Sequence, residues 1–258
     1  MKLTILGSGT SQGVPIIGCN CEVCRSDDPR DKRLRCSAMI EGDDFRFVID
    51  AGPDFRQQML RAKVRQIDAL LLTHEHKDHT GGIDDLRALN FVDYPIVRKI
   101  DIYGAPHTLE CIKHDYYYAF SADKYRGVPE LELVAFDPAK SFEVKGVEII
   151  PITGHHSARF SVTGFRFGKV AYLTDFSEIE AAEEAKLSGV EVLVVNALRH
   201  ESHPSHFNVG QALELIARVA PHRAYLTHAS HDIGLHASVN SSLPSGVELA
   251  YDTLEIEI

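Results

Sequence analysis

The feature that most constrains this chain is a run of histidines and acids directly after a short apolar segment. Residues 70–72 are followed by His74, His76, Asp78 and His79, and then by two glycines. On an extended segment alternate side chains point the same way, so His74 and His76 can hold one ion together. The turn that follows directs Asp78 and His79 toward a second ion. One short loop therefore predicts two adjacent metal sites.

The size and charge of the chain limit what it can be. A length of 258 residues with 44% hydrophobic residues can bury a full core, and no repeat or long linker interrupts it, so we expect a single domain over residues 1–258. No apolar run approaches the roughly 20 residues of a membrane span, and the first residues lack the features of a signal peptide. We therefore expect a soluble, cytoplasmic protein with no membrane partner.

The net charge bears on the substrate. A formal net charge of -10 disfavours the binding of long nucleic acids, which are themselves anionic. A small anionic substrate needs only a local positive centre, and bound metal would supply one. The chain is therefore expected to act on a small molecule.

Strand-like and helix-like segments alternate along the chain, which is typical of a layered α/β fold. The predicted strands are 3–5, 45–49, 69–72, 100–103, 147–150, 170–173, 192–195 and 224–226. The predicted helices are 54–62, 83–90, 108–120, 178–187 and 209–219. Hairpin-like stretches at 141–151 and 160–173 indicate mixed sheets. Segments 91–99 and 116–130 fit neither pattern and suggest an inserted cap or loop.

The H-x-H-x-D-H run, with Asp50 upstream in Ile49-Asp50-Ala51-Gly52, resembles the signature of the metallo-β-lactamase superfamily. The resemblance extends over nearly the whole chain. It implies a four-layer αββα fold, in which two mixed β-sheets are sandwiched between helices. It also implies that the remaining ligand positions recur in order further along the sequence.

Seven metal ligands are implied by this resemblance. They are His74, His76 and His156 for the first site, Asp78, His79 and His228 for the second, and Asp175 as a bridge between them. Either His155 or His156 could complete the first site, and related phosphodiesterases carry their histidine five positions after a comparable proline, which favours His156. Any one of these residues could be an ordinary polar side chain, but the ordered set favours a metal centre.

Asp50 is interpreted as a residue that holds the 74–79 loop through hydrogen bonds, behind the ligands themselves. The alternative is a turn-forming aspartate before Gly52.

Three cysteines form a second cluster near the amino terminus. Cys19, Cys21 and Cys24 are too close together to staple a fold among themselves, and three thiolates at this spacing need one more ligand to complete a tetrahedral zinc. The segment from His228 to His231 resembles a family pattern in which the second histidine serves structural zinc, so His231 is the candidate. The alternative is a set of buried or redox-active thiols without metal.

The reaction can be narrowed from the metals and one further histidine. Two divalent ions roughly 3.5–4 Å apart can hold a hydroxide between them as the nucleophile, and zinc, manganese or iron would accept these ligands. A leaving alkoxide needs a proton, and His200, His203 and His206 precede a predicted helix. Ser205-His206-Phe207 resembles the leaving-group histidine segment of superfamily phosphodiesterases. His206 and Asp78 are therefore the predicted catalytic residues, with His200 and His203 as alternatives.

The resemblance extends to one subfamily. The stretch 7–15, the cysteine cluster and Arg35-Cys36-Ser37 look closest to cyclic ribose-phosphate phosphodiesterases of the phosphonate-degrading pathway. This implies a metal-dependent hydrolase that acts on a small phosphodiester, such as a cyclic phosphodiester of ribose or of a nucleotide. The expected cofactors are two divalent ions, zinc or manganese or else iron, and one structural zinc.

Other functions stay open at this point. A tRNA 3′-end nuclease, a thioester hydrolase and a non-catalytic cofactor-biosynthesis protein could share the fold. The aromatic run 116–120 could stack on a substrate or form one side of a packed helix. A homodimer is the default assembly, because symmetric dimers are the commonest among soluble enzymes.

Overall fold

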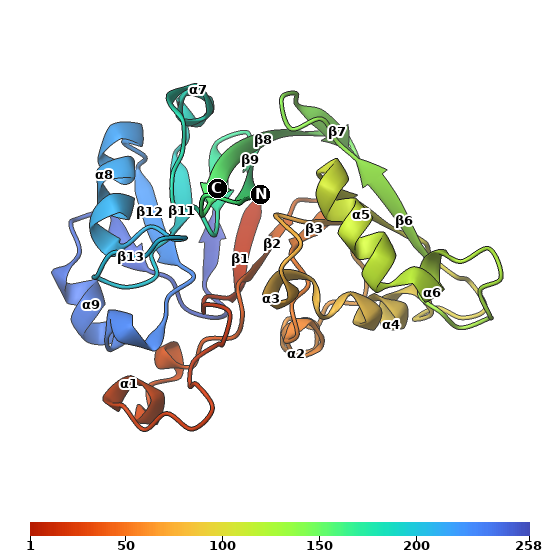
Figure 1. Ribbon diagram of the computed structural model, residues 1–258, viewed down its shortest axis with the longest axis horizontal. Helices are drawn as coiled ribbons and strands as arrows, with labels where there is room; N and C mark the ends of the chain where they lie inside the picture. The colour runs from red at the N-terminus through yellow and green to blue at the C-terminus, as the bar shows by residue number, and fades with distance from the viewer.

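Two seven-stranded sheets form the centre of the molecule, seen here as a computed structural model that describes residues 1–258 (Figure 1). The first sheet has the order β14-β1-β2-β3-β4-β5-β6, and the second has the order β13-β12-β11-β10-β9-β8-β7. The strands of the first sheet are β1 (Lys2–Gly7), β2 (Ser37–Glu41), β3 (Arg46–Ile49), β4 (Ala69–Leu71), β5 (Ile100–Gly104), β6 (Leu131–Ala135) and β14 (Glu255–Glu257). Those of the second are β7 (Phe142–Val144), β8 (Val147–His156), β9 (Phe160–Phe167), β10 (Val170–Leu173), β11 (Val192–Asn196), β12 (Arg223–Thr227) and β13 (Val247–Leu249).

Helices cover the outer face of each sheet, which gives four layers (Figure 1). On the first sheet lie α2 (Phe55–Arg61), α3 (Lys77–Thr80), α4 (Leu86–Asn90), α5 (Pro106–Asp115) and α6 (Tyr117–Phe120); on the second lie α7 (Ala181–Glu184), α8 (Val209–Val219) and α9 (His236–Ser242). The short α1 (Glu22–Arg25) belongs to the amino-terminal loop, and four 3₁₀ turns are η1 (Pro29–Asp31), η2 (Ile83–Asp85), η3 (Ala185–Leu187) and η4 (His231–Ile233). The expected αββα fold is confirmed.

The alternation of side chains along the strands produces these layers. In β11, Val192 and Val194 enter the buried cluster between the two sheets, whereas Leu193 and Val195 enter the cluster under α8 and α9. Successive residues of a strand face opposite sides of the sheet, so a strand that is apolar at every position is buried on both faces. The continuous β-branched runs of the sequence are explained by this double burial.

Both sheets are mixed, as the hairpin patterns predicted. Strands β3 to β6 are parallel, and so are β10 to β13, while the remaining pairs are antiparallel. The β7–β8 hairpin turns at Lys145 and Gly146, both with positive φ (52° and 77°), which matches the twist of a tight two-residue turn. No helix combines the length and apolar composition that crossing a bilayer requires.

Several predicted boundaries were wrong. The predicted helix 108–120 is divided into α5 and α6, because Tyr116 (φ -111°, ψ 34°) leaves helical geometry. The predicted helix 178–187 begins only at Ala181 and ends as the 3₁₀ turn η3. Strands β2, β6, β13 and β14 had no predicted counterpart. β6, β13 and β14 are short and pair with strands distant in sequence, so long-range pairing defines them. β2 pairs with β1 and, across the short turn 42–45, with β3.

Candidate metal centre

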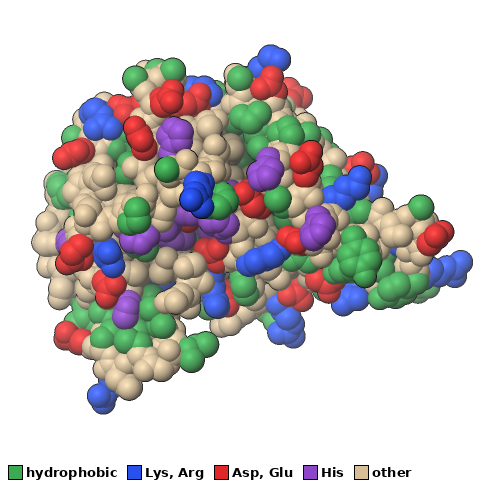
Figure 2. All heavy atoms as spheres, in the orientation of Figure 1, with side chains coloured by type: hydrophobic (Ala, Val, Ile, Leu, Met, Phe, Trp, Pro, Cys, Tyr) green, Lys and Arg blue, Asp and Glu red, His purple; other side chains and the backbone are tan.

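The predicted ligands come from the ends of strands in both sheets. His74 and His76 follow β4, Asp175 follows β10, His228 follows β12, and His156 is the last residue of β8. The carboxyl ends of parallel strands share one edge of a sheet, so residues far apart in the sequence meet there. Histidine side chains accordingly gather near the centre of the face drawn in Figure 2.

Asp175 lies in the middle of this cluster. Its Oδ2 is 3.2 Å from His79 Nε2 and 3.3 Å from His228 Nδ1, and Asp78 Oδ2 is also 3.2 Å from His79 Nε2. Four overlapping groups each have their possible ligand atoms within 4.8 Å of one another: His74, His76 and His156; His74, His79 and Asp175; Asp78, Asp175 and His228; and His156, Asp175 and His206. The structure thus brings all seven predicted ligands together, with Asp175 shared between the two ends of the cluster.

The structure separates His155 from His156. Along β8 neighbouring side chains point in opposite directions, so only one of the two can face the cluster. His156 is buried, and its Nδ1 lies 2.9 Å from both the Asp175 and the Ser205 carbonyl oxygens, which fixes the proton on Nδ1 and leaves Nε2 free for a metal. His155 is half-exposed, with Nε2 3.8 Å from Glu180.

The residues present fit metal ions. The Nε2 atoms of His74 and His79 are buried and have no hydrogen-bond partner. His79 Nε2 has two carboxylate oxygens only 3.2 Å away, yet neither lies where its N–H could donate. Ligand atoms about 2.0–2.1 Å from one zinc at tetrahedral angles are about 3.3 Å apart, which is the spacing found here. Buried polar atoms seldom lack partners, so shared coordination of a cation explains these two.

Electrostatics favour the same interpretation. Burial holds the pKa of His74 well below its ordinary value and lowers that of His228 to about 3, so both rings are neutral, as metal ligands must be. Burial also acts to lower the pKa of His79, but the carboxylates of Asp175, Asp50 and Asp78 raise it well above its ordinary value. A proton on His79 partly neutralises the negative charge of these carboxylates, and a bound cation would neutralise it instead.

Asp50 occupies the place behind the ligands that the sequence predicted. It is fully buried; its Oδ2 lies 2.7 Å from His79 Nδ1 and accepts a hydrogen bond of 2.8 Å from Thr73 Oγ1, while its Oδ1 accepts one of 2.9 Å from Thr73 N–H. Asp50, Asp175 and His228 all have positive φ (62°, 64° and 57°). Non-glycine residues in this region are costly and cluster at functional sites. Each strand therefore makes a sharp turn just where it delivers a polar side chain.

His206 is the histidine of the 198–209 loop that reaches the cluster. Its Nε2 is 3.1 Å from Asp175 Oδ1, and its ring stacks on that of His228 at a centroid distance of 4.9 Å. His203 contacts His206 and not the ligands, and His200 is exposed. Helix α8 holds this loop, because Asn208 and Gln211 cap its first turn with bonds of 2.8 and 3.0 Å.

The cysteine cluster also assembles. His231 Nδ1 lies 3.2 Å from Cys21 Sγ, 3.4 Å from Cys19 Sγ and 3.6 Å from Cys24 Sγ. Zn–S bonds of about 2.3 Å and Zn–N bonds of about 2.0–2.1 Å at a tetrahedral angle place such atoms about 3.6 Å apart. The four residues thus fit one zinc ion, which would join the amino-terminal loop to η4. The other cysteines lie elsewhere, with Cys36 buried beside the Tyr172 hydroxyl.

Sequence reasoning missed several threonines that hold the ligands. Thr174 Oγ1 donates to Asp175 Oδ2 at 2.6 Å, and Thr10 Oγ1 lies 3.1 Å from His228 Nε2. A signal was present, because the dipeptide Leu-Thr directly precedes His74, Asp175 and His228. Hydroxyl groups of this kind orient metal ligands by hydrogen bonding.

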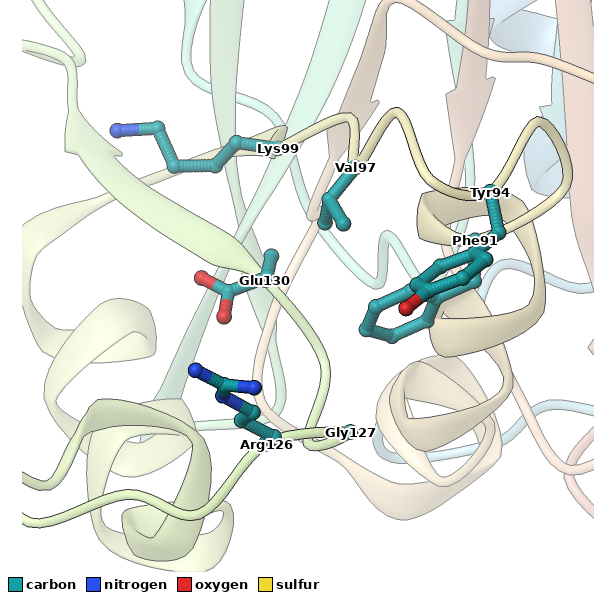
Figure 3. Close-up of a pocket in the computed structure, with 7 residues that line it drawn as sticks. All are labelled: Phe91, Tyr94, Val97, Lys99, Arg126, Gly127 and Glu130. Carbon is teal, nitrogen blue, oxygen red and sulfur yellow. The ribbon is translucent and has the colours of Figure 1, made fainter.

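A large cavity lies elsewhere in the molecule. It has a volume of about 810 Å³, and none of the predicted metal ligands lines it. Its walls come from the two segments predicted as an inserted cap, with Phe91, Tyr94 and Val97 on one and Arg126 and Glu130 on the other (Figure 3). This cavity is therefore separate from the candidate metal centre.

Comparison with known proteins supports the geometry. Residues 45–229, more than half of the chain, match the family model described as the beta-lactamase superfamily domain. The chain belongs to the metallo-β-lactamase superfamily. It is similar to the crystal structure of a diphosphatase from the PhnP family, with 39% sequence identity and a TM-score of 0.92 over 100% of this chain and 97% of that one. The chain is thus similar to this diphosphatase in both fold and sequence.

The chain is also similar to two other known proteins. An octanoyltransferase of Porphyromonas gingivalis is 40% identical over 99% of this chain and 51% of its own length, so the chain spans about half of that relative. The zinc-bound PqqB of Methylobacterium extorquens covers all of both chains with a TM-score of 0.75 at 20% identity, which is a likeness of fold.

Proposed function

We propose that this member of the metallo-β-lactamase superfamily is a phosphodiesterase with two divalent metal ions, which hydrolyses a small phosphodiester. The observation that carries the proposal is the position of His206, whose Nε2 lies 3.1 Å from the shared ligand Asp175. A proton donor beside the metal cluster serves a reaction whose leaving group is a poor one. The likeness to a PhnP-family diphosphatase supports chemistry at phosphorus.

Each part of the cluster has a role in this proposal. His74, His76 and His156 would hold one ion, Asp78, His79 and His228 would hold the other, and Asp175, which lies among both sets, would be shared. When bound, such a pair makes hydroxide available at neutral pH and neutralises charge that develops on phosphorus. Zinc and manganese suit these nitrogen and oxygen ligands, and iron is the next candidate. His206 donates its Nε2 proton to the leaving oxygen.

The alternative is a thioester hydrolase, because the P. gingivalis relative is named as an octanoyltransferase, which is an acyl-transfer enzyme. A thiol has an unperturbed pKa of about 8.5, so a thiolate leaves without a proton donor, whereas an alkoxide does not. His206 would then have no task. A tRNA nuclease is less favoured because the net charge of -10 opposes the binding of a long polyanion.

The experiment compares three classes of substrate with the metal-loaded protein. Bis(p-nitrophenyl) phosphate represents diesters, p-nitrophenyl phosphate represents monoesters, and an acyl thioester represents the alternative; a cyclic ribose phosphate and a diphosphate diester then narrow the substrate. We expect turnover of the diester that Asp78→Ala abolishes, by about 10³-fold or more, and that His206→Ala lowers about 10²–10⁴-fold on substrates with poor leaving groups.

The controls decide between the candidates. Metal content is measured for each variant, so that loss of an ion is distinguished from loss of a proton donor. His222→Asn changes an exposed histidine at the opposite end of β12 from His228 and should leave the rates unchanged. Preference for the thioester, or no diester turnover with zinc, manganese or iron, would refute the proposal.

A further inference from the structure

The side chains of Ser205 and His203 both contact Nδ1 of His206. Ser205 Oγ lies 3.0 Å from His206 Nδ1 and 3.1 Å from His203 Nδ1, and the two ring nitrogens are 3.2 Å apart. All three side chains are partly buried in the loop before α8. The Nδ1 side of His206 is therefore held by the protein, while its Nε2 side faces Asp175.

The direction of these hydrogen bonds follows from the backbone. The Ser205 N–H donates to His203 Nδ1 at 3.3 Å, so that nitrogen carries a lone pair. Burial, followed by the charges of His206 and Arg199, lowers the pKa of His203 and keeps its ring neutral. With His203 as the acceptor, the hydroxyl of Ser205 donates to it, and His206 Nδ1–H donates to Ser205 Oγ.

Ring stacking alone does not fix where the two nitrogens of His206 lie. The ring is stacked on His228 with an interplanar angle of 18° and meets His156 edge to face at 4.8 Å. These contacts set the plane of the imidazole, but a half-turn about the Cβ–Cγ bond would leave the plane unchanged and put the ring carbons Cδ2 and Cε1 where Nδ1 and Nε2 lie. Hydrogen bonds to Ser205 and His203 remove that freedom.

We infer that His203 and Ser205 are a positioning pair, which keeps the proton of His206 on Nδ1 and turns Nε2 toward the reacting bond. The inference rests on the proposed function, since it concerns how its leaving-group histidine is aimed. Neither residue touches the metal ligands through its side chain, so the pair acts through His206.

The proton balance shows why this tautomer matters. As hydroxide forms the new P–O bond, the bond to the leaving oxygen breaks and its electron pair stays on that oxygen. For this step His206 must carry a proton on each ring nitrogen; the one on Nε2 moves to the oxygen and yields a neutral alcohol. His206 is then neutral with its remaining proton on Nδ1, which is the form that Ser205 accepts from. The opposite tautomer would leave Ser205 Oγ without a donor and would put two acceptor nitrogens, His206 Nδ1 and His203 Nδ1, 3.2 Å apart.

The test uses full-length protein and a series of methyl aryl phosphodiesters whose phenols differ in acidity. Ser205→Ala and His203→Ala are compared with Ser205→Thr, which keeps the hydroxyl, and with His203→Asn, whose Oδ1 replaces Nδ1 as an acceptor. His222→Asn is the control. Metal content is measured throughout, and the imidazole nitrogens of His206 are followed by ¹H–¹⁵N NMR in metal-free and zinc-loaded protein.

We expect Ser205→Ala and His203→Ala to lower the rate of hydrolysis about 10–100-fold for the diester of the least acidic phenol, which is part of what a general acid supplies. For the p-nitrophenyl diester the rate should fall less than about threefold. The conservative variants should recover most of this loss. NMR should show the Nδ1–H tautomer of His206 in the unsubstituted protein and loss of that signal pattern in Ser205→Ala.

Other outcomes overturn the inference. An equal loss with every phenol at unchanged metal content would mean that the pair only supports the loop, and no loss with the least acidic phenol would mean that it has no role. If the unsubstituted protein cleaved no diester at all, the proposed function would fail, while the NMR of His206 would still decide whether the pair sets its tautomer.

Discussion

At the scale of single residues, the centre depends on side chains that orient the ligands. Asp50 accepts from His79 and from Thr73, and Thr174 donates to Asp175. A ligand held on both sides loses little freedom when a metal binds, and its donor nitrogen is fixed. These partners are buried, so their hydrogen bonds cannot be replaced by water without cost.

Asp50→Asn should weaken metal binding without unfolding the protein. The amide keeps an acceptor but removes the charge opposite His79 Nδ1, so we expect an affinity loss of about 10–100-fold for the second ion. Competition with a chromophoric chelator measures it, and the exposed Asp44→Asn is the matched control. Unchanged affinity would show that Asp50 serves only the turn before Gly52.

At the scale of elements, the positions of short segments depend on contacts with residues that are distant in the sequence. A Cβ on Gly52 would lie 2.0 Å from the carbonyl oxygen of Asp78, so the α3 turn approaches the strand end as closely as glycine allows. The amino-terminal loop similarly meets η4 through the four residues of the cysteine cluster. Both contacts fix loops that carry ligands.

Zinc binding to the cysteine cluster should strengthen as pH rises. Burial raises the pKa of Cys24 to about 11, while the Cys24 N–H lowers that of Cys21 to about 6. Zinc takes thiolates, so binding at neutral pH must release the Cys24 proton, and below about pH 6 a second proton from Cys21 opposes it further. Affinity is measured by chelator competition from pH 5.5 to 8.

Cys111→Ser is the control for this measurement, since Cys111 lies outside the cluster, whereas Cys21→Ser should abolish tight binding. A zinc affinity that does not change with pH would contradict a thiolate-ligated site.

At the scale of the whole molecule, the candidate metal centre draws its residues from both sheets. His74 to His79 belong to loops of the first sheet, and His156, Asp175 and His228 belong to the second. The cluster of apolar residues between the sheets therefore sets the distance between the two halves of the ligand set. Packing in this layer is part of the geometry of the site.

Phe165→Ala should cost about 3–5 kcal/mol of unfolding free energy, the usual loss for a fully buried phenylalanine. Phe165 in β9 is 0% exposed and meets Phe136 of the opposite half edge to face at 5.9 Å. Urea unfolding measures the loss, and metal content should fall with it. Tyr94→Ala, at a side chain that is 77% exposed, should change stability by less than about 0.5 kcal/mol.

The sequence by itself determined the fold class and the identity of the ligand candidates, because the His74–His79 spacing, the strand-end acids and the apolar runs are local patterns. Only the tertiary structure decided that His156 faces the cluster rather than His155, that Ser205 and His203 hold His206, and that β14 joins β1 across the whole length of the chain. The reason is physical: which face a side chain takes and which strand pairs with which depend on contacts between residues that are close in space but distant along the sequence.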